Sequence, residues 1–133
     1  MRLDSDERIA ALTAYIEEAK TAPFEWGKSD CCAWAAKWFE IATGETLNLT
    51  PYSSKEEALA LKKDGLLALW TDVLGDPRQE WEAPEFGDVG IVDTARYGHM
   101  GVIFLNDGVA VWRLENGQPF PFRPRNFVAF WSV

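Results

Sequence analysis

The spacing of apolar residues changes near Gly75 and Pro77, and this change constrains the fold more than any other feature of the chain. Before it, apolar residues recur at helical spacing; after it, β-branched and aromatic residues form short runs of strand length. Helical segments followed by a group of strands are typical of an α+β domain with an antiparallel sheet. We therefore expect an α+β fold, and the length of 133 residues suggests a single domain over 1–133.

Four helices are expected before this change. Asp4 and Glu7 have the spacing of a capping box, so the first helix should begin at Asp4. Pro23 disfavours helical backbone in the residue before it, and Gly44 is a typical helix stop. The expected bounds are Asp4–Lys20, Asp30–Thr43, a helix that starts at Ser53 or Ser54 and ends at Gly65, and 66–75.

Four runs rich in β-branched and aromatic residues follow, and they predict strands. Their sequences are GDVGIVD, HMGVIFL, VAVWRL and FVAFWSV. The residues NDG, 106–108, predict a hairpin turn between the second and third runs, and ENGQP predicts a further turn. The second helix should therefore pack on an antiparallel sheet in which HMGVIFL is a central strand.

The overall charge argues against nucleic acid as a partner. The net charge is −8 and the sequence pI is about 4.6, whereas phosphate binding requires a footprint of Lys and Arg. The local basic cluster Arg113–Arg125 is diluted by prolines, and we expect it on a solvated face. The seven tryptophans are expected mainly in the core rather than in a ring-binding groove.

The sequence contains no stretch of about 18 apolar residues, so no membrane insertion is expected. The first ten residues are acidic and polar, unlike a secretory signal peptide. We therefore expect synthesis in a cytosol, where thiols stay reduced. A disulfide between the neighbouring Cys31 and Cys32 is disfavoured, because the small ring that it closes would be strained.

Cys31 falls in the first turn of the expected second helix, with Asp30 or the serine before it as N-cap. The unpaired N–H groups and the positive end of the helix dipole favour a thiolate there, which is the nucleophilic form of cysteine. Helical spacing sets Cys31 opposite the polar Lys37 and Glu40, so it should face whatever packs on the helix. Cys32 lies about 100° away and is expected to be a small buried residue. The stripe that contains Cys31 continues through Ala35, Trp38 and Ala42.

Helix position alone leaves Cys31 open to a second interpretation as an inert buried residue, because free cysteines are often buried. A zinc site fits less well still, since adjacent cysteines and one histidine lack the usual ligand spacing. The single histidine, His99, favours the reactive alternative, although a lone histidine can also be structural. It begins the expected central strand, where an imidazole could take the thiol proton and return it to a leaving group.

Four short stretches carry a resemblance to a known family. PFEWG comes before the cysteine helix, DCCAW begins it, and FGDVGIV and HMGVIF fall in strands. In this order they resemble the motifs of NlpC-type peptidases, a papain-like cysteine hydrolase superfamily that cuts bacterial cell-wall peptides. The resemblance runs from Pro23 to about Trp112. The form of the first two stretches is similar to a branch found largely in phages and prophages, where such domains sit in tail-assembly modules.

The resemblance implies roles for individual residues. Cys31, directly after the aspartate, matches the nucleophile, and His99 matches the general base. Asp30 matches a residue that we interpret as a helix cap and dipole partner rather than a proton carrier. The oxyanion would then be held by backbone N–H groups at the helix start, including that of Cys31. Phe24 stands where the family has a tyrosine near the active site, and with Trp26 it is a candidate for substrate binding.

The third catalytic position of the family, a polar residue that orients the histidine, falls at or near Trp112. Tryptophan has only an N–H donor and cannot accept the imidazole N–H. Asp93, at the end of the first strand run, is our candidate replacement, with a backbone carbonyl or a water as alternatives. Trp112 is a further candidate for substrate binding. Asp88 is expected to fix the start of a strand through turn hydrogen bonds rather than to take part in the reaction.

Three functions follow as expectations. The first is a cysteine endopeptidase or amidase that cleaves an amide bond in bacterial cell-wall peptides, in a phage or prophage tail, without metal or cofactor. Such a chain would be made in the bacterial cytoplasm and incorporated in the virion beside other tail proteins. The second is a structural or protein-binding tail component with weak or lost catalysis, which Phe24 and Trp112 favour. The third keeps the Cys-His pair but uses it on another amide, ester or acyl donor.

Overall fold

The computed structural model describes residues 3–21, 31–47, 56–57, 66–78, 83–94, 98–113, 117–124 and 126–133. In these ranges the helices are α1 (Ser5–Ala19), α2 (Cys31–Thr43) and α4 (Leu66–Leu74), and residues 56–57 are also helical. The strands are β1 (Val89–Thr94), β2 (Gly98–Phe104), β3 (Ala110–Arg113), β4 (Pro119–Phe122) and β5 (Phe127–Trp131), with a 3-10 turn η1 (Asn106–Gly108). The helices precede the strands along the chain, so the predicted α+β class is confirmed.

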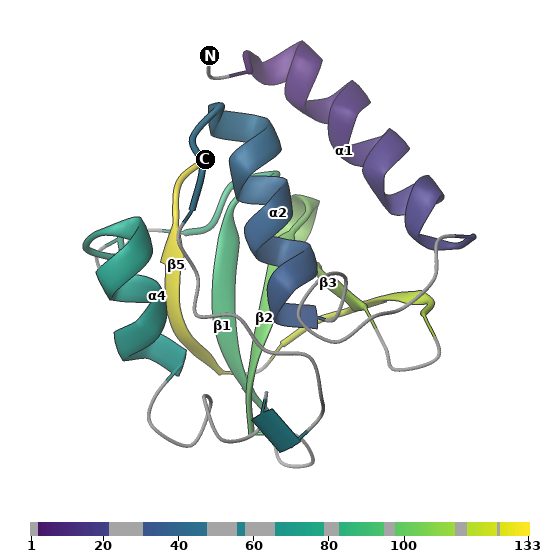
Figure 1. Cartoon of the computed structure of the whole chain (residues 1–133). Helices are drawn as coiled ribbons and strands as arrows, with labels where there is room; N and C mark the ends of the chain where they lie inside the picture. The colour runs from purple at the N-terminus through teal and green to yellow at the C-terminus, as the bar shows by residue number, and fades with distance from the viewer. Residues whose placement is uncertain are drawn as a thin grey trace.

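The strands form one five-stranded antiparallel sheet in the order β4-β3-β2-β1-β5. β2 is therefore the middle strand, as predicted for HMGVIFL. α2 packs on one face of this sheet, α1 packs on α2 from outside, and α4 lies against β5 (Figure 1). The helix that begins with the two cysteines is thus held on the antiparallel sheet, as the sequence predicts.

The predicted helix ends agree with the structure in the described ranges. The Asp4 carboxylate accepts from the Glu7 N–H at 2.8 Å, and the Glu7 carboxylate accepts from the Asp4 N–H at 3.1 Å, which completes the capping box. α2 ends before Gly44, which has a φ of 76° and donates its N–H to the Glu40 carbonyl at 2.8 Å. α4 matches the fourth predicted helix. Of the third, only residues 56–57 are described. No helix of the described ranges is long and apolar enough to cross a bilayer.

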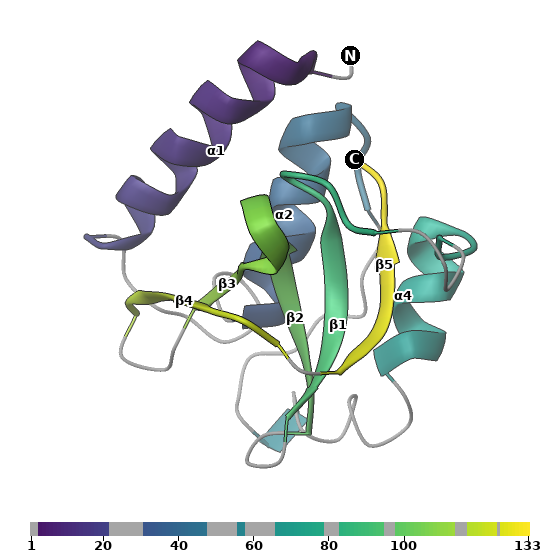
Figure 2. The ribbon, with the colours of Figure 1, turned by 180° about the vertical axis from the view of Figure 1, so that it is seen from behind.

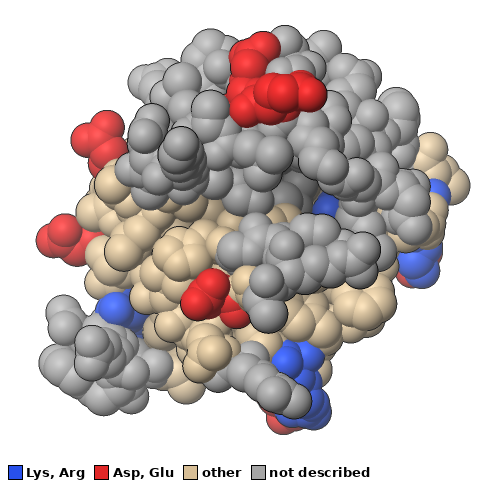
Figure 3. Space-filling view, turned by 90° about the horizontal axis from the view of Figure 1, so that it is seen from below, with Lys and Arg blue, Asp and Glu red and all other residues tan. Residues whose placement is uncertain are grey.

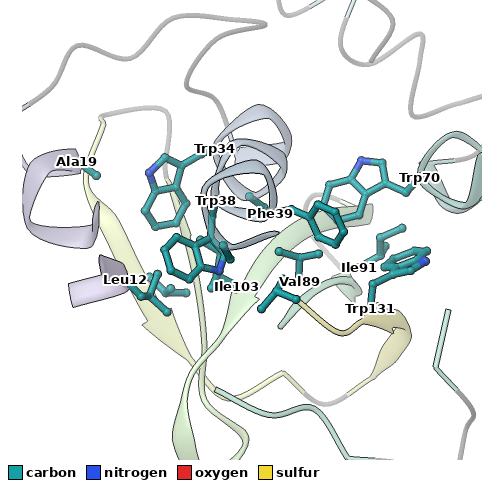
Figure 4. Packing of buried hydrophobic residues seen from close by; sticks show 14 of the residues in the cluster. Leu12, Ala19, Trp34, Trp38, Phe39, Trp70, Val89, Ile91, Ile103 and Trp131 are labelled. Carbon is teal, nitrogen blue, oxygen red and sulfur yellow. The ribbon is translucent and has the colours of Figure 1, made fainter. Parts of the chain in front are cut away.

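The main core lies between α2 and the face of the sheet that α2 covers, which we call the helix-side face (Figure 4). Ala35, Trp38 and Ala42 are fully buried and Lys37 is exposed, so the predicted helical phase of α2 is confirmed. The indole N–H of Trp38 donates to the Gly87 carbonyl at 2.7 Å and fixes the helix to the start of β1. The side chains that β1, β2, β3 and β5 contribute to this face are Val89, Ile91, Ile103, Val111 and Trp131.

A second buried cluster lies on the opposite face of the sheet. This face of the sheet is turned to the viewer in Figure 2. It is rich in aromatic rings: Trp112 packs on Phe122 with centroids 4.5 Å apart, and Phe104 packs on Phe130 at 6.2 Å. Its buried members are Val92, Val102, Phe104, Ala110, Trp112 and Phe130. Five of the seven tryptophans are buried, which confirms the expected core role for those described, while Trp26 and Trp81 lie outside the described residues.

Strand β4 was not predicted from the sequence. Its residues PFPF contain two prolines, which have no N–H to donate to a neighbouring strand. β4 is an edge strand that pairs with β3 alone, so prolines are tolerated on its outer side. The four runs predicted from the sequence correspond to β1, β2, β3 and β5. β4 was missed because its two prolines are unfavourable in most strands.

Candidate active site

The first two residues of α2 are Cys31 and Cys32. Their backbone is described, whereas their side chains, the predicted cap Asp30 and the aromatic candidates Phe24 and Trp26 lie outside the described part of the chain. Position 31 is one helical turn before the fully buried Ala35, so it continues the inward stripe of α2. The first turn of a helix has unpaired N–H groups and a partial positive charge, so negative charge is stabilised at this position.

His99 lies directly opposite Asp93 across strands β2 and β1. The N–H of Asp93 points the other way, to β5, where it donates to the Asn126 carbonyl at 3.1 Å. The Asp93–His99 pair is therefore of the type that exchanges no backbone hydrogen bond, in which the two Cα atoms are only about 4.5 Å apart and the side chains are closest. The strand register thus brings a carboxylate beside the single imidazole of the chain.

The Asp93–His99 pair is on the helix-side face of the sheet. Ile91 of β1 and Ile103 of β2 belong to the cluster under α2, and side chains alternate between faces along a strand. Asp93, two residues after Ile91, and His99, four residues before Ile103, share that face. His99 is half-buried and Asp93 is exposed. The two groups therefore lie on the covered face but at its solvent-accessible end.

The start of α2 points towards the same end of the sheet. α2 contacts β2 and runs in the same direction, so its N-terminal end is directed towards the end at which β2 begins and β1 finishes (Figures 1 and 2). The cysteines at the start of α2 and the pair formed by Asp93 and His99 thus belong to one end of one face. The pairing of the Cys31 thiol with His99 stays a prediction, because the Cys31 side chain is outside the described part of the chain.

A β-bulge lies next to Asp93. Ile91 pairs with Ala129 of β5, whereas the next residue, Val92, pairs with Phe127, so Val128 is the extra residue. Bulges bend a strand and increase its local twist, and they redirect neighbouring side chains. The bulge therefore bends β5 beside the end of β1 that carries Asp93.

Trp112 is not brought to this site. It belongs to the cluster on the opposite face of the sheet and is 7% exposed. The residue before it, Val111, belongs to the helix-side core instead. The position that the family resemblance assigns to the orienting residue therefore faces away from His99. Asp93 is the described carboxylate that the register brings to the imidazole.

Asp88 has the structural role that the sequence predicts. Its buried carboxylate accepts from the Glu85 N–H at 2.9 Å and from the Val133 N–H at 3.3 Å, just before β1 begins. Burial raises the pKa of this carboxyl above its ordinary value, although both hydrogen bonds act in the opposite direction. Asp88 thus fixes the start of β1 through the Glu85 N–H and links it to Val133 through the second hydrogen bond.

The prediction of a solvated face for the cluster Arg113–Arg125 is wrong for its first residue. Arg113 is 3% exposed and donates to the carbonyls of Gly117, at 2.9 Å, and Ala19, at 3.1 Å. Its charge can be buried because both hydrogen bonds are made inside the protein. Arg123, by contrast, is exposed. The burial of Arg113 could not be predicted from the sequence, because an arginine among prolines has no pattern that distinguishes it from a surface residue.

Charged side chains are dispersed at the end of the molecule where the site lies. Viewed from below, the basic groups of the described residues lie at several separate places, some of them beside acidic groups (Figure 3). Among the described residues, no three His, Cys, Asp or Glu side chains are close enough to hold a metal ion. The expectation that the site needs no metal stays a prediction.

Comparison with protein families adds one assignment. A family model described as a domain of unknown function, DUF6950, matches residues 2–133. The chain belongs to this family. No curated protein matches it. Because the DUF6950 description gives no activity, a function for this chain has to be argued from its own residues.

The arrangement in this DUF6950 chain permits a defined chemistry. A helix start that favours negative charge, an imidazole and a carboxylate are the parts of a Cys-His nucleophilic site. The N–H groups of the first turn of α2 can stabilise a developing oxyanion. The roles of Phe24 and Trp26 in substrate binding stay predictions, since both residues are outside the described ranges.

Proposed function

We propose that this DUF6950 chain is a cysteine hydrolase of the papain-like, NlpC type that cleaves an amide bond in bacterial cell-wall peptides. The setting that we propose is a phage or prophage tail, after synthesis in the bacterial cytoplasm. The observation that carries the proposal is the Asp93–His99 pair on the helix-side face, at the end towards which the start of α2 is directed. The family resemblance of DCCAW and HMGVIF supports the same assignment.

The reaction has two steps. The Cys31 thiolate attacks the carbonyl carbon of the amide, and backbone N–H groups at the start of α2 stabilise the oxyanion. The imidazolium of His99 gives its proton to the leaving amine as the C–N bond breaks, which leaves a thioester on Cys31. His99 then takes a proton from water, the hydroxide attacks the thioester, and the acid product leaves as the thiol regains its proton.

Asp93 has the role of a positioning residue in this mechanism. A carboxylate that accepts one imidazole N–H selects the tautomer whose other nitrogen faces the thiol. The closeness of the two residues across β1 and β2 supports this role. Trp112, on the opposite face, has no part in the proposed reaction.

Digestion of purified peptidoglycan tests the activity and its substrate. Wild type should release soluble peptides, Cys31→Ala should release none above background, and Cys32→Ala, the matched control, should retain activity. A panel of small amides, thioesters and esters tests the alternative that the Cys-His pair acts on another acyl donor. Equal digestion by wild type and Cys31→Ala would rule out the proposed nucleophile.

Alkylation by iodoacetamide tests the nucleophile without knowledge of the substrate. In a Cys32→Ala background the label reports on Cys31 alone, and its rate as a function of pH gives the thiol pKa. We expect a value well below the ordinary value of about 8.5. Slow labelling with an ordinary pH profile would contradict the proposal.

A structural tail component of the same fold is the second candidate. Phe120 and Phe127 favour it, because they are 47% and 45% exposed and exposed aromatic rings are common at protein interfaces. In a phage that encodes this chain, the structural role predicts that Cys31→Ala particles assemble and infect normally. The enzymatic role predicts normal assembly but less efficient passage through the cell wall.

A further inference from the structure

The side chain of Tyr15 connects α1 to the first turn of α2. Its hydroxyl donates to the Trp34 carbonyl at 2.6 Å, and its ring stacks on the Trp34 indole with centroids 5.2 Å apart and an interplanar angle of 13°. It also contacts the Trp38 ring, one turn further along α2, at 5.9 Å. Both indoles are buried and project from α2 into the main core (Figure 4). The ring and the hydroxyl of Tyr15 therefore hold the end of α2 that begins with Cys31.

The Trp34 carbonyl receives this hydrogen bond in addition to the one that the helix supplies. In α2 the N–H of Trp38 donates to the carbonyl of Trp34, four residues earlier. A carbonyl oxygen has two lone pairs and can accept both hydrogen bonds. Burial raises the pKa of Tyr15 above its ordinary value, so the hydroxyl keeps its proton at the pH values where cysteine chemistry is measured. The backbone of α2 is thus satisfied without Tyr15, and the hydroxyl polarises the Trp34 carbonyl further.

One hydrogen bond of α2 connects this carbonyl to the helix start. The Ala35 N–H, which shares a peptide unit with the Trp34 carbonyl, donates to the Cys31 carbonyl. The Cys31 carbonyl in turn shares its peptide unit with the N–H of Cys32. That N–H is one of the four at a helix start that have no acceptor within the helix. Because hydrogen bonds in a chain polarise one another, donation by Tyr15 makes the Cys32 N–H a stronger donor.

We propose that Tyr15 is a positioning residue: through the Trp34 carbonyl it fixes and polarises the first turn of α2, whose Cys32 N–H stabilises the oxyanion of the scissile carbonyl. This inference rests on the proposed function, in which N–H groups at the start of α2 stabilise that oxyanion. It concerns the backbone of Cys32 and not its thiol, so a Cys32→Ala background leaves the donor in place. Tyr15 transfers no proton in the reaction; its hydroxyl donates one hydrogen bond throughout.

Replacement of Tyr15 by Phe keeps the stacked ring and removes the hydroxyl. Removal of a direct oxyanion donor lowers kcat about 10²- to 10³-fold, and loss of a group that acts through such a donor should lower kcat less, by about 3- to 10-fold. With soluble cell-wall peptide fragments as substrate, KM should stay within about twofold of wild type, because the hydrogen bond acts on the transition state. Alkylation of Cys31 by iodoacetamide forms no oxyanion, so its rate should also stay within about twofold.

Thr43→Val is the matched control for the loss of a hydroxyl. The Thr43 hydroxyl donates to the Phe39 carbonyl at 2.7 Å, so this variant also removes a hydroxyl-to-carbonyl hydrogen bond from α2, but at the opposite end of the helix. Its kcat should equal that of wild type, although both variants should lose stability in urea unfolding. A fall of kcat in Tyr15→Phe alone thus separates an effect on the helix start from a general loss of stability.

Tryptophan fluorescence establishes that each variant is folded. Tyr15→4-aminophenylalanine keeps a weaker N–H donor, so its kcat should lie between those of wild type and Tyr15→Phe, and it replaces Tyr15→Phe if that variant is not folded. An unchanged kcat in folded Tyr15→Phe, a wild-type kcat in the 4-aminophenylalanine variant, or an equal fall in Thr43→Val overturns the inference. A wild type without Cys31-dependent hydrolysis overturns the proposed function instead, so the two failures are distinct.

Discussion

Asp93 on β1 lies directly opposite His99 on β2, and both residues belong to the face of the sheet that α2 covers. The backbone N–H of Asp93 is directed to β5, so no ladder hydrogen bond separates the two residues and their side chains are as near as a strand pair allows. This relationship places a carboxylate-bearing residue directly across from the single imidazole of the chain, independently of position 112.

Replacement of Asp93 by Asn tests its positioning role. The variant keeps the shape of the side chain but loses its negative charge. We expect kcat/KM for Cys31-dependent hydrolysis to fall about 10- to 100-fold, because His99 would still act as acid and base but with a less favourable orientation. Asp107→Asn is the matched control, because Asp107 is exposed in the hairpin turn and asparagine tolerates its φ of 58°. Equal losses in both variants would argue against a specific role of Asp93.

Replacement of Trp112 by Phe separates the two faces of the sheet. Trp112 is buried against Phe122 on the opposite face, so the smaller ring should lower the free energy of unfolding by about 1–2 kcal/mol. Hydrolysis by the folded enzyme should be unchanged, because the side chain is directed away from His99. Urea unfolding and steady-state rates measure the two effects. A large loss of kcat with little loss of stability would place Trp112 in the site after all.

The pH dependence of stability tests the buried carboxyl of Asp88. Burial raises its pKa in the folded state above the unfolded value of about 3.9, so the folded protein binds this proton more tightly. The stabilisation is complete below the unfolded pKa and is lost as pH rises through the folded pKa. Relative to Asp88→Asn, wild type should therefore lose stability between pH 3 and pH 7 in urea unfolding. A gain over this range would show that hydrogen bonds from Glu85 and Val133 outweigh burial.

The helices could be predicted from the sequence because their ends are encoded locally. The capping box of Asp4 and Glu7 and the stop at Gly44 act within a few residues, and the structure contains both. Strand β4 was missed for the opposite reason, since its prolines are compatible with a strand only at an edge. Whether a segment is an edge depends on tertiary structure, which local sequence does not encode.

The face on which Trp112 lies depends on one residue of the hairpin between β2 and β3. The structure has a three-residue loop, Asn106–Gly108, with Leu105 donating its N–H to the Val109 carbonyl at 2.7 Å. Ile103 is therefore opposite Val111, and Trp112 falls on the face opposite to His99. A two-residue loop would shift the register by one and turn Trp112 to the same face as His99. The letters NDG predict a turn but do not decide between these loops.

The proposed function depends on His99 lowering the pKa of the Cys31 thiol. Alkylation of Cys31 in two proteins, one with His99 and one without it, measures this effect most directly. In the Cys32→Ala background, the pH profile of iodoacetamide labelling is compared between the protein with His99 and the variant His99→Ala. If the two residues form a Cys-His pair, the thiol pKa is depressed when His99 is present. Without His99, labelling at neutral pH is slower by about tenfold or more. Identical profiles with a pKa near 8.5 would contradict a Cys-His catalytic pair.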